Sequence, residues 1–261
     1  MRKELRDLRS NRQVWAGYLI LPVITLGLPI LLLALIPLMI RPESASDPGM
    51  RMLLESVEAD PSLRGSDLSE RLARLLLRDY GIMYLLMPMI LAAGSSALSI
   101  VREKEQRTLE PILATPIQDV QLLWAKLFAV MGAPLLVTWA TGLVGLLVSA
   151  VASYFLIDVA IGPTAGNLVA LILLGPVLAA AAGLAGIGVS MRLTDSQAAN
   201  QFVGLVIVPA ALVLAALFGR PAMVSPLAGL AGMVIGVGIC ALLFRRALRR
   251  LRREELLTRW R

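Results

Sequence analysis

The sequence predicts an all-α integral membrane protein with six transmembrane helices. Hydrophobic residues make up 57% of the 261 residues and charged residues only 16%, which is far from the composition of a water-soluble domain. Six long stretches contain no charged residue, and each exceeds the ~20 residues that cross the hydrocarbon core of a bilayer. A transmembrane β-barrel is excluded, because its strands would appear as ~10-residue segments of alternating polarity, whereas these stretches are continuous runs of Leu, Ala, Val and Ile.

The elements follow in order along the chain. Residues 1–13 place two leucines on one face among Arg and Glu, which predicts a short amphipathic helix in the membrane interface. The first span contains Pro22, Pro29 and Pro37, whose spacing puts them near one helix face, where they should kink or curve the helix. A six-span transmembrane domain occupies residues 14–261, with spans at about 14–40, 79–101, 121–153, 166–191, 199–219 and 226–245.

The loop between the first two spans, residues 41–78, is the only sizeable connection. Within it, Asp67 to Glu70 matches a capping box that opens an amphipathic helix, which we expect to lie on the outer surface of the membrane. The other connections are short, and a basic tail occupies residues 245–261.

The basic residues predict that both termini lie in the cytoplasm, because Lys and Arg accumulate on that side of a multi-pass protein. With the N-terminus inside, eighteen of the 25 Lys and Arg fall on the cytoplasmic side. The first span is too long for the apolar region of a signal peptide, so we expect the mature chain to keep it in the plasma membrane, the inner membrane of a bacterial cell. The net charge of +7 flanks the spans, which indicates contact with membrane lipid and no binding of nucleic acid.

The residue types exclude several kinds of chemistry. The chain has no His, which removes the usual acid–base residue, and its one cysteine, Cys240, cannot form a thiolate metal site. None of its three lysines stands in a G-x-x-x-x-G-K-[ST] phosphate loop, so the chain cannot hydrolyse ATP by that route. The span centres lack carboxylates and lysines, which disfavours an autonomous proton-coupled transporter. We therefore expect no catalytic residue, metal or cofactor in this chain.

A charged segment that turns amphipathic follows the second span and reads R-E-K-E-Q-R-T-L-E-P-I-L-A-T-P over residues 102–116. Thr108 would cap a short helix whose first turn holds Glu110, beside the positive end of the helix dipole, and Pro111, where early amides lack partners. The apolar residues at helical spacing are Leu109, Ile112, Leu113 and Ile117. The segment is therefore expected to contact a partner protein.

This segment resembles the cytoplasmic motif that follows the second span in permeases of the type 2 ATP-binding-cassette (ABC) exporter family, R-E-x-E-x-G-T-L-E-x-L-L-x-T-P. Further points of similarity are Lys126, the stretch from Asp195 to Gln201, and the basic tail. Arg107 stands where members of the family commonly have Gly, which leaves the branch of the family open.

The resemblance implies that the chain is the transmembrane subunit of an ABC exporter. A second permease subunit, identical or different, would complete the pathway, and separate cytoplasmic ABC ATPase subunits would bind ATP and Mg and dock beneath it. Residues 102–118 would form the coupling segment, with apolar side chains in a cleft of the ATPase and charges that fix the orientation. The residues that match the motif are Arg102, Glu103, Glu105, Arg107, Thr108, Leu109, Glu110, Ile112, Leu113 and Thr115.

Several alternatives stay open. The short helix after Thr108 would, without a partner, pack its leucines on the protein's own inner face. The whole chain could instead be a membrane sensor or scaffold with permease architecture, or a lipid-modifying membrane enzyme, although the acidic residues of loop 41–78 alternate with Arg as on a solvated surface. The motif Gly232-x-x-x-Gly236 predicts close helix packing, within one chain or between subunits. The polar residues that line a path or bond neighbouring helices are Ser95, Ser96, Thr138, Thr141 and Asn200.

Overall fold

The computed structural model describes residues 12–40, 48–59, 67–105, 117–191 and 226–250, and the single residues Leu63, Leu193, Ala198, Gln201 and Gly204. All regular structure in these ranges is helical, which confirms the all-α prediction. The elements are α2 (Arg12–Met39), α3 (Pro48–Ala59), α4 (Leu68–Asp79), the 3₁₀ turn η2 (Tyr80–Ile82), α5 (Met83–Glu105), α7 (Asp119–Ile157), α8 (Ala165–Val169), the π-helical segment η3 (Ala170–Leu174), α9 (Gly175–Ser190) and α11 (Pro226–Arg250).

Five helical segments in the described ranges are long and apolar enough to span a membrane. They are Ala16–Met39, Leu68–Ser99, Asp119–Ile157, Ala165–Ser190 and Leu230–Arg249. The remaining predicted span, 199–219, lies outside the described residues except for Gln201 and Gly204. The predicted interfacial helix over residues 1–13 also lies outside them, apart from Arg12 and Gln13 at the start of α2.

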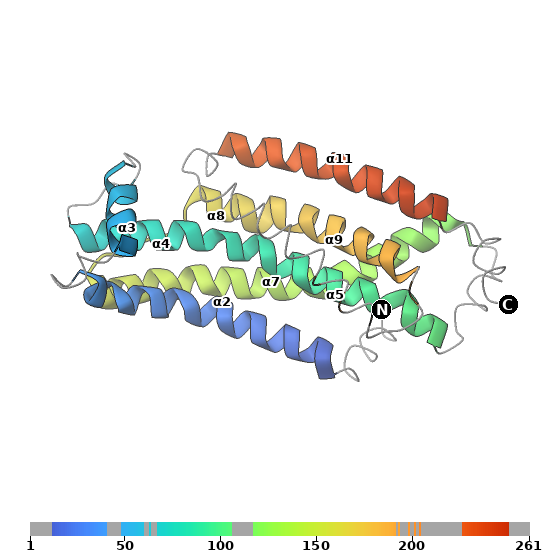
Figure 1. Cartoon of the computed structure of the whole chain (residues 1–261), viewed down its shortest axis with the longest axis horizontal. Helices are drawn as coiled ribbons and strands as arrows, with labels where there is room; N and C mark the ends of the chain where they lie inside the picture. The colour runs from blue at the N-terminus through green and yellow to red at the C-terminus, as the bar shows by residue number, and fades with distance from the viewer. Residues whose placement is uncertain are drawn as a thin grey trace.

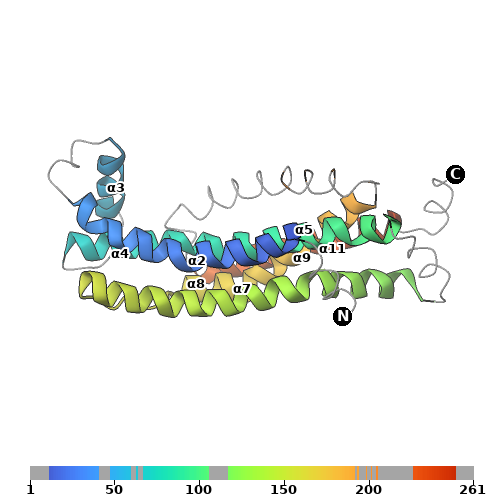
Figure 2. The same cartoon turned by 90° about the horizontal axis from the view of Figure 1, so that it is seen from below.

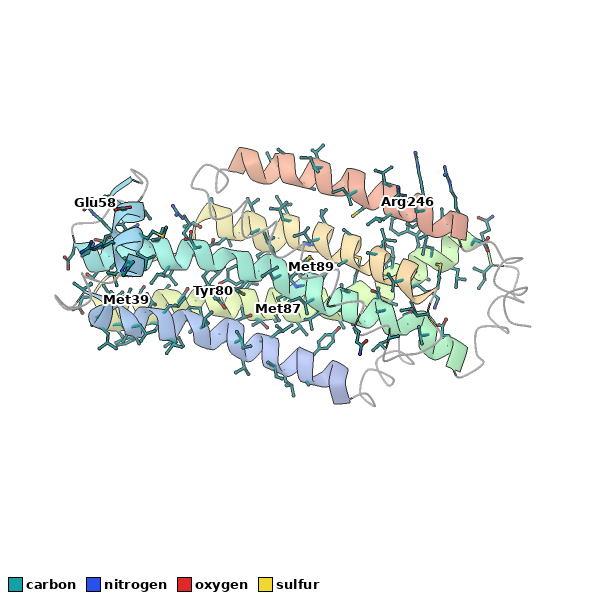
Figure 3. The ribbon with its side chains drawn as sticks, in the orientation of Figure 1. Met39, Glu58, Tyr80, Met87, Met89 and Arg246 are labelled. Atoms are coloured by element: carbon teal, nitrogen blue, oxygen red, sulfur yellow. The ribbon has the colours of Figure 1, made fainter. Side chains whose placement is uncertain are left out.

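The five long segments run side by side along the length of the molecule (Figures 1 and 2). α5 is the centre of the arrangement: it packs most extensively on α9 and also contacts α7 and α2, while α11 packs on α9. At one end α2 begins, α5 ends, α7 begins and α9 and α11 end; we call it the basic end, because exposed arginines of α11 such as Arg246 extend there (Figure 3). The opposite end carries α3 and α4, and we call it the loop end.

The amphipathic helix of the loop forms as α4, but it does not lie across the end of the bundle. It begins after Asp67, whose carboxylate accepts a hydrogen bond from the Leu68 amide at 2.8 Å. The helix continues through η2 into α5 and shares its direction in both views (Figures 1 and 2). The apolar face of α4 is buried against protein, since Ala73 and Leu77 lie in a cluster with Leu33 of α2. α4 therefore continues the line of α5 toward the loop end and packs on α2.

A proline in α2 creates a contact between α2 and η2. Pro29 has no N–H, so the carbonyl of Thr25, four residues earlier, loses its intrahelical donor. The hydroxyl of Tyr80 donates to that carbonyl at 2.9 Å. The Thr25 hydroxyl in turn donates to the sulfur of Met87 at 3.8 Å. Tyr80 and Met87, the two partners of Thr25, come from the η2–α5 segment and point into the bundle (Figure 3). The hydrogen bonds thus fix α2 against α5 at the level of the proline.

Small residues bring α5, α9 and α11 close together, as expected for helices in lipid. A Cβ added at Gly186 of α9 would collide with the Ser96 hydroxyl of α5 and lie 3.1 Å from the Ala93 carbonyl oxygen. A Cβ at Gly236 of α11 would come within 2.5 Å of a methyl group of Val177 on α9. Gly236 of the Gly232-x-x-x-Gly236 motif therefore packs on α9 of the same chain.

The length of α7 and its aromatic residues mark two levels along the bundle. α7 has 39 residues, which span about 58 Å, against about 30 Å for the hydrocarbon core. Exposed aromatic side chains occur near both ends, Trp124 and Phe128 toward the basic end and Tyr154 and Phe155 toward the loop end. The two groups lie about 40–45 Å apart along the helix, which matches a bilayer with its headgroup layers. We call these groups the two aromatic belts.

Candidate coupling site between α5 and α7

The structure describes the two helices that flank the predicted coupling segment. α5 ends at Glu105, so Arg102, Glu103 and Glu105 all belong to its last turns, and among them the side chain of Glu103 is described. α7 begins at Asp119. The other predicted site residues lie outside the described residues: Arg107, Thr108, Leu109, Glu110, Ile112, Leu113 and Thr115.

An ion pair joins the end of α5 to the first turns of α7. The ammonium of Lys126 lies 2.5 Å from a carboxylate oxygen of Glu103, with exposed side-chain fractions of 6% for Lys126 and 22% for Glu103. A carboxylate in the last turn of a helix faces the negative end of the helix dipole, so a cation is needed to balance it. A lysine this deeply buried in turn requires an anion. Each residue therefore stabilises the other.

The helix ends at this site are also packed firmly onto α9 and α11. Leu123 of α7 is fully buried in a cluster with Ile187 and Met191 at the end of α9 and with Ala247 of α11. On α5, the amide of Val101 donates to the Ser190 hydroxyl of α9 at 3.1 Å. Both flanking helix ends are therefore packed against the end of α9.

The start of α7 is a defined helix terminus. The Gln118 side chain accepts from the amide of Gln121, and the Gln118 amide donates to the side-chain oxygen of Gln121 at 3.4 Å, which together form a capping box. Ile117 and Val120 are each 43% exposed beside this terminus. The prediction placed the third span at 121–153, whereas α7 extends from Asp119 to Ile157. The capping box was not predicted, because Gln is not among the usual N-cap residues.

The polar residues considered for a transport path are used in helix packing. The Ser96 hydroxyl donates to the Ala93 carbonyl at 2.9 Å, and the Ser95 hydroxyl donates to the Leu91 carbonyl at 2.8 Å. Both of these bonds stay within α5, while the Ser95 hydroxyl also hydrogen-bonds the Tyr18 hydroxyl of α2 at 3.1 Å and Ser96 lies against Gly186 of α9. Thr138 and Thr141 are buried within α7, and the Thr138 hydroxyl has no hydrogen-bond partner within the described ranges. Asn200 lies outside the described residues.

Comparison with known proteins agrees with the motif and with the helical architecture. Residues 1–231 match a protein family described as ABC-2 family transporter protein. No curated protein and no solved structure matches the chain. The family match covers α2 through the first turns of α11 and includes residues 102–118, the predicted coupling segment. Because it extends over most of the sequence, the chain belongs to the ABC-2 family of transporter proteins.

Proposed function

We propose that this chain, a membrane transport component and not an enzyme by itself, is the permease subunit of an ABC exporter driven by a separate ATPase. The observation that carries the proposal is the Glu103–Lys126 pair, which ties together the two helices flanking residues 106–116. The pair holds the two ends of this segment close together, at the level where the segment leaves the described helices. A segment that receives force from a partner would need both of its attachment points held.

The packing of α5 gives the proposed force a route into the membrane. α5 contacts α2, α7 and α9, and the α4–α5 span is the most buried of the five candidate spans. A displacement of its basic end would therefore shift the centre of the bundle, whereas a displacement of the little-buried α11 would move mainly itself. ATP-driven closure of the ATPase would enter through the coupling helix, including Leu109, Ile112 and Leu113, and tilt α5 and α7 together.

The orientation and the partners complete the proposal. The basic end would face the cytoplasm and the loop end the cell exterior, because Lys and Arg resist translocation. Both termini would be cytoplasmic, in the plasma membrane. ATP and Mg would be bound by the ATPase subunit, and a second permease subunit would complete the pathway. The motif at residues 102–116 supports export as the direction, because it resembles that of exporters in this family.

Co-purification tests the proposed coupling. The tagged chain is co-expressed with a candidate ABC ATPase subunit from the same organism and purified in mild detergent, and the bound ATPase is quantified. Leu109→Asp should reduce the recovered ATPase strongly, because a carboxylate would have to enter an apolar cleft. The control is Met52→Asp, which changes a 75% exposed apolar residue of α3 at the other end of the molecule. Equal recovery of the ATPase with both variants would overturn the coupling assignment.

Labelling tests the orientation separately. Cys240, the only cysteine, is replaced by Ser, and single cysteines are then introduced at Met52 and at Arg246. A membrane-impermeant maleimide should label Met52→Cys in intact spheroplasts and Arg246→Cys only after permeabilisation. The reverse pattern would show that the basic end faces outward and would refute the proposal.

A further inference from the structure

A pocket of about 390 Å³ lies at the loop end, inside a single chain and far from the coupling site. Its walls come from α4, η2, α5, α7 and the connection that leads from α7 into α8. The volume is within the range of small-molecule sites, roughly 300–1,000 Å³.

Specific hydrogen bonds build the wall that the connection provides. The amide of Ile161 donates to the Ser153 hydroxyl of α7 at 2.9 Å, which folds the connection back onto α7. Thr164 then caps α8 by accepting from the Asn167 amide at 3.3 Å. Both Ile161 and Asn167 line the pocket as a result, and Ile161 also lies in one buried cluster with Leu77 of α4.

Two buried polar groups in the pocket lack partners within the described part of the chain. Tyr84 is 2% exposed and Asn167 is 7% exposed, and both line the pocket. Neither the Tyr84 hydroxyl nor the Asn167 side-chain amide makes a hydrogen bond with a described residue, and both atoms reach the pocket surface. Because both atoms are accessible from the pocket, they are available to hydrogen-bond to a molecule that occupies it.

The charge of the lining favours an anion. Arg74 and Arg78 line the pocket, and no carboxylate does so among the described residues. The carboxylates that pair with these arginines, Glu70 at 2.6 Å and Asp79 at 3.1 Å, lie outside the lining. The guanidinium groups of both arginines and the hydroxyl of Tyr84 are donors, which fit a group rich in acceptor oxygens.

The depth of the pocket favours an amphiphile. Ser149 of α7 lines the pocket and lies five residues, or about 8 Å, from Tyr154 toward the membrane centre. The pocket is thus at the boundary between headgroups and hydrocarbon, below the aromatic belt at the loop end. Apolar side chains such as Leu146 and Leu77 complete its inner wall.

We propose that this pocket binds a single-chain amphiphile with an anionic head, a carboxylate or a phosphate monoester. The head lies near Arg74 and Arg78 and accepts hydrogen bonds from Tyr84 and Asn167, while the hydrocarbon chain lies against Leu146 and its apolar neighbours. Binding here needs neither ATP nor a partner subunit, so it can be measured on the purified chain alone.

Photocrosslinking tests the proposal. The full-length chain in phosphatidylcholine nanodiscs is irradiated with a diazirine analogue of dodecanoic acid, and labelled peptides are mapped by mass spectrometry. Label should concentrate on peptides that line the pocket. Dodecanoate and dodecyl phosphate should compete, the stronger of them identifying the head, and dodecyltrimethylammonium should not. If the pocket holds only water, label should spread evenly over the lipid-facing helices, and that result would overturn the proposal. Equal competition by dodecyltrimethylammonium would also overturn it.

Variants separate the pocket from general lipid contact. Tyr84→Phe should weaken binding about 2- to 12-fold through the loss of one hydrogen bond, while Tyr154→Phe, an exposed tyrosine outside the pocket, should not change it. Ser149→Phe should abolish binding by filling the cavity, provided that its thermal unfolding resembles that of the wild type. If Ser149→Phe does not fold, Tyr84→Phe still decides, since unchanged affinity in that variant refutes the assigned site.

Discussion

The ion pair between Glu103 and Lys126 should be the most sensitive polar contact at the basic end. Glu103→Gln keeps the shape of the side chain and removes its charge, which leaves the ammonium of Lys126, 6% exposed, without a compensating carboxylate at 2.5 Å. Removing one partner of a fully buried pair costs about 3–5 kcal/mol, and an exposed pair contributes only about 0–1 kcal/mol. Since Glu103 is 22% exposed, we expect an intermediate cost of about 2 kcal/mol.

A double-mutant cycle measures this cost. The free energy of unfolding in mixed micelles is compared for the wild type, Glu103→Gln, Lys126→Met and the double variant. The double variant has no unpaired charge, so it should be more stable than the sum of the single changes predicts, with a coupling of about 1–3 kcal/mol. The pair between Glu70 and Arg74, with side chains 11% and 39% exposed, is the comparison within one helix, and its cycle should give a smaller coupling, below about 1 kcal/mol. Additive effects in the Glu103–Lys126 cycle would refute the reasoning.

Two further predictions concern the helix contacts. Tyr80→Phe should lower the free energy of unfolding by about 1–2 kcal/mol, because it removes the donor to the Thr25 carbonyl. In a Pro29→Ala background the helix regains a backbone donor for that carbonyl, so the same change should cost much less. An equal loss with Pro29 and with Ala at position 29 would contradict this explanation. Gly186→Ala should lower the melting temperature, because the added methyl collides with α5 at a cost of about 1–3 kcal/mol, whereas Gly27→Ala, which meets open space, should be neutral or stabilising. Equal melting temperatures for the two glycine variants would show that α5 and α9 are not in close contact.

The sequence predicted the elements of the fold that depend on composition and local pattern. Long apolar stretches predicted the helices, and Asp67 correctly marked the start of α4. The position of α4 was not predictable in the same way, because an amphipathic face indicates burial without saying whether lipid or protein covers it. Here Leu33 and Ile36 of α2 cover that face. The division of the predicted span 166–191 into α8, η3 and α9 likewise depends on tertiary contacts, such as the Trp139 indole N–H that donates to the Leu171 carbonyl at 3.1 Å.

At the candidate site, the sequence identified the segment but not the contact that frames it. Glu103 was predicted as one of several charges in a motif, and Lys126 as a separate point of resemblance. Their pairing joins residues that are 23 positions apart, and no periodicity within one helix connects them. The signal that was available is the position of Lys126 next to a charge-free run of thirty-one residues, since a lysine bordering such a run needs an anion from another helix.

The aromatic belts explain why a buried ion pair is tolerable at this place in a membrane protein. Lys126 stands between Trp124 and Phe128, so it lies in the headgroup layer at the basic end and not in the hydrocarbon core. The free-energy cost of desolvating the two charges is smaller there than at the centre of a bilayer, where placing a single charge costs at least about 2.5–3.5 kcal/mol. The same layer is where α5 ends before the predicted coupling segment and where α7 begins. A contact at this level is strong enough to hold the two helices together, and it is also within reach of a partner that binds at the membrane surface.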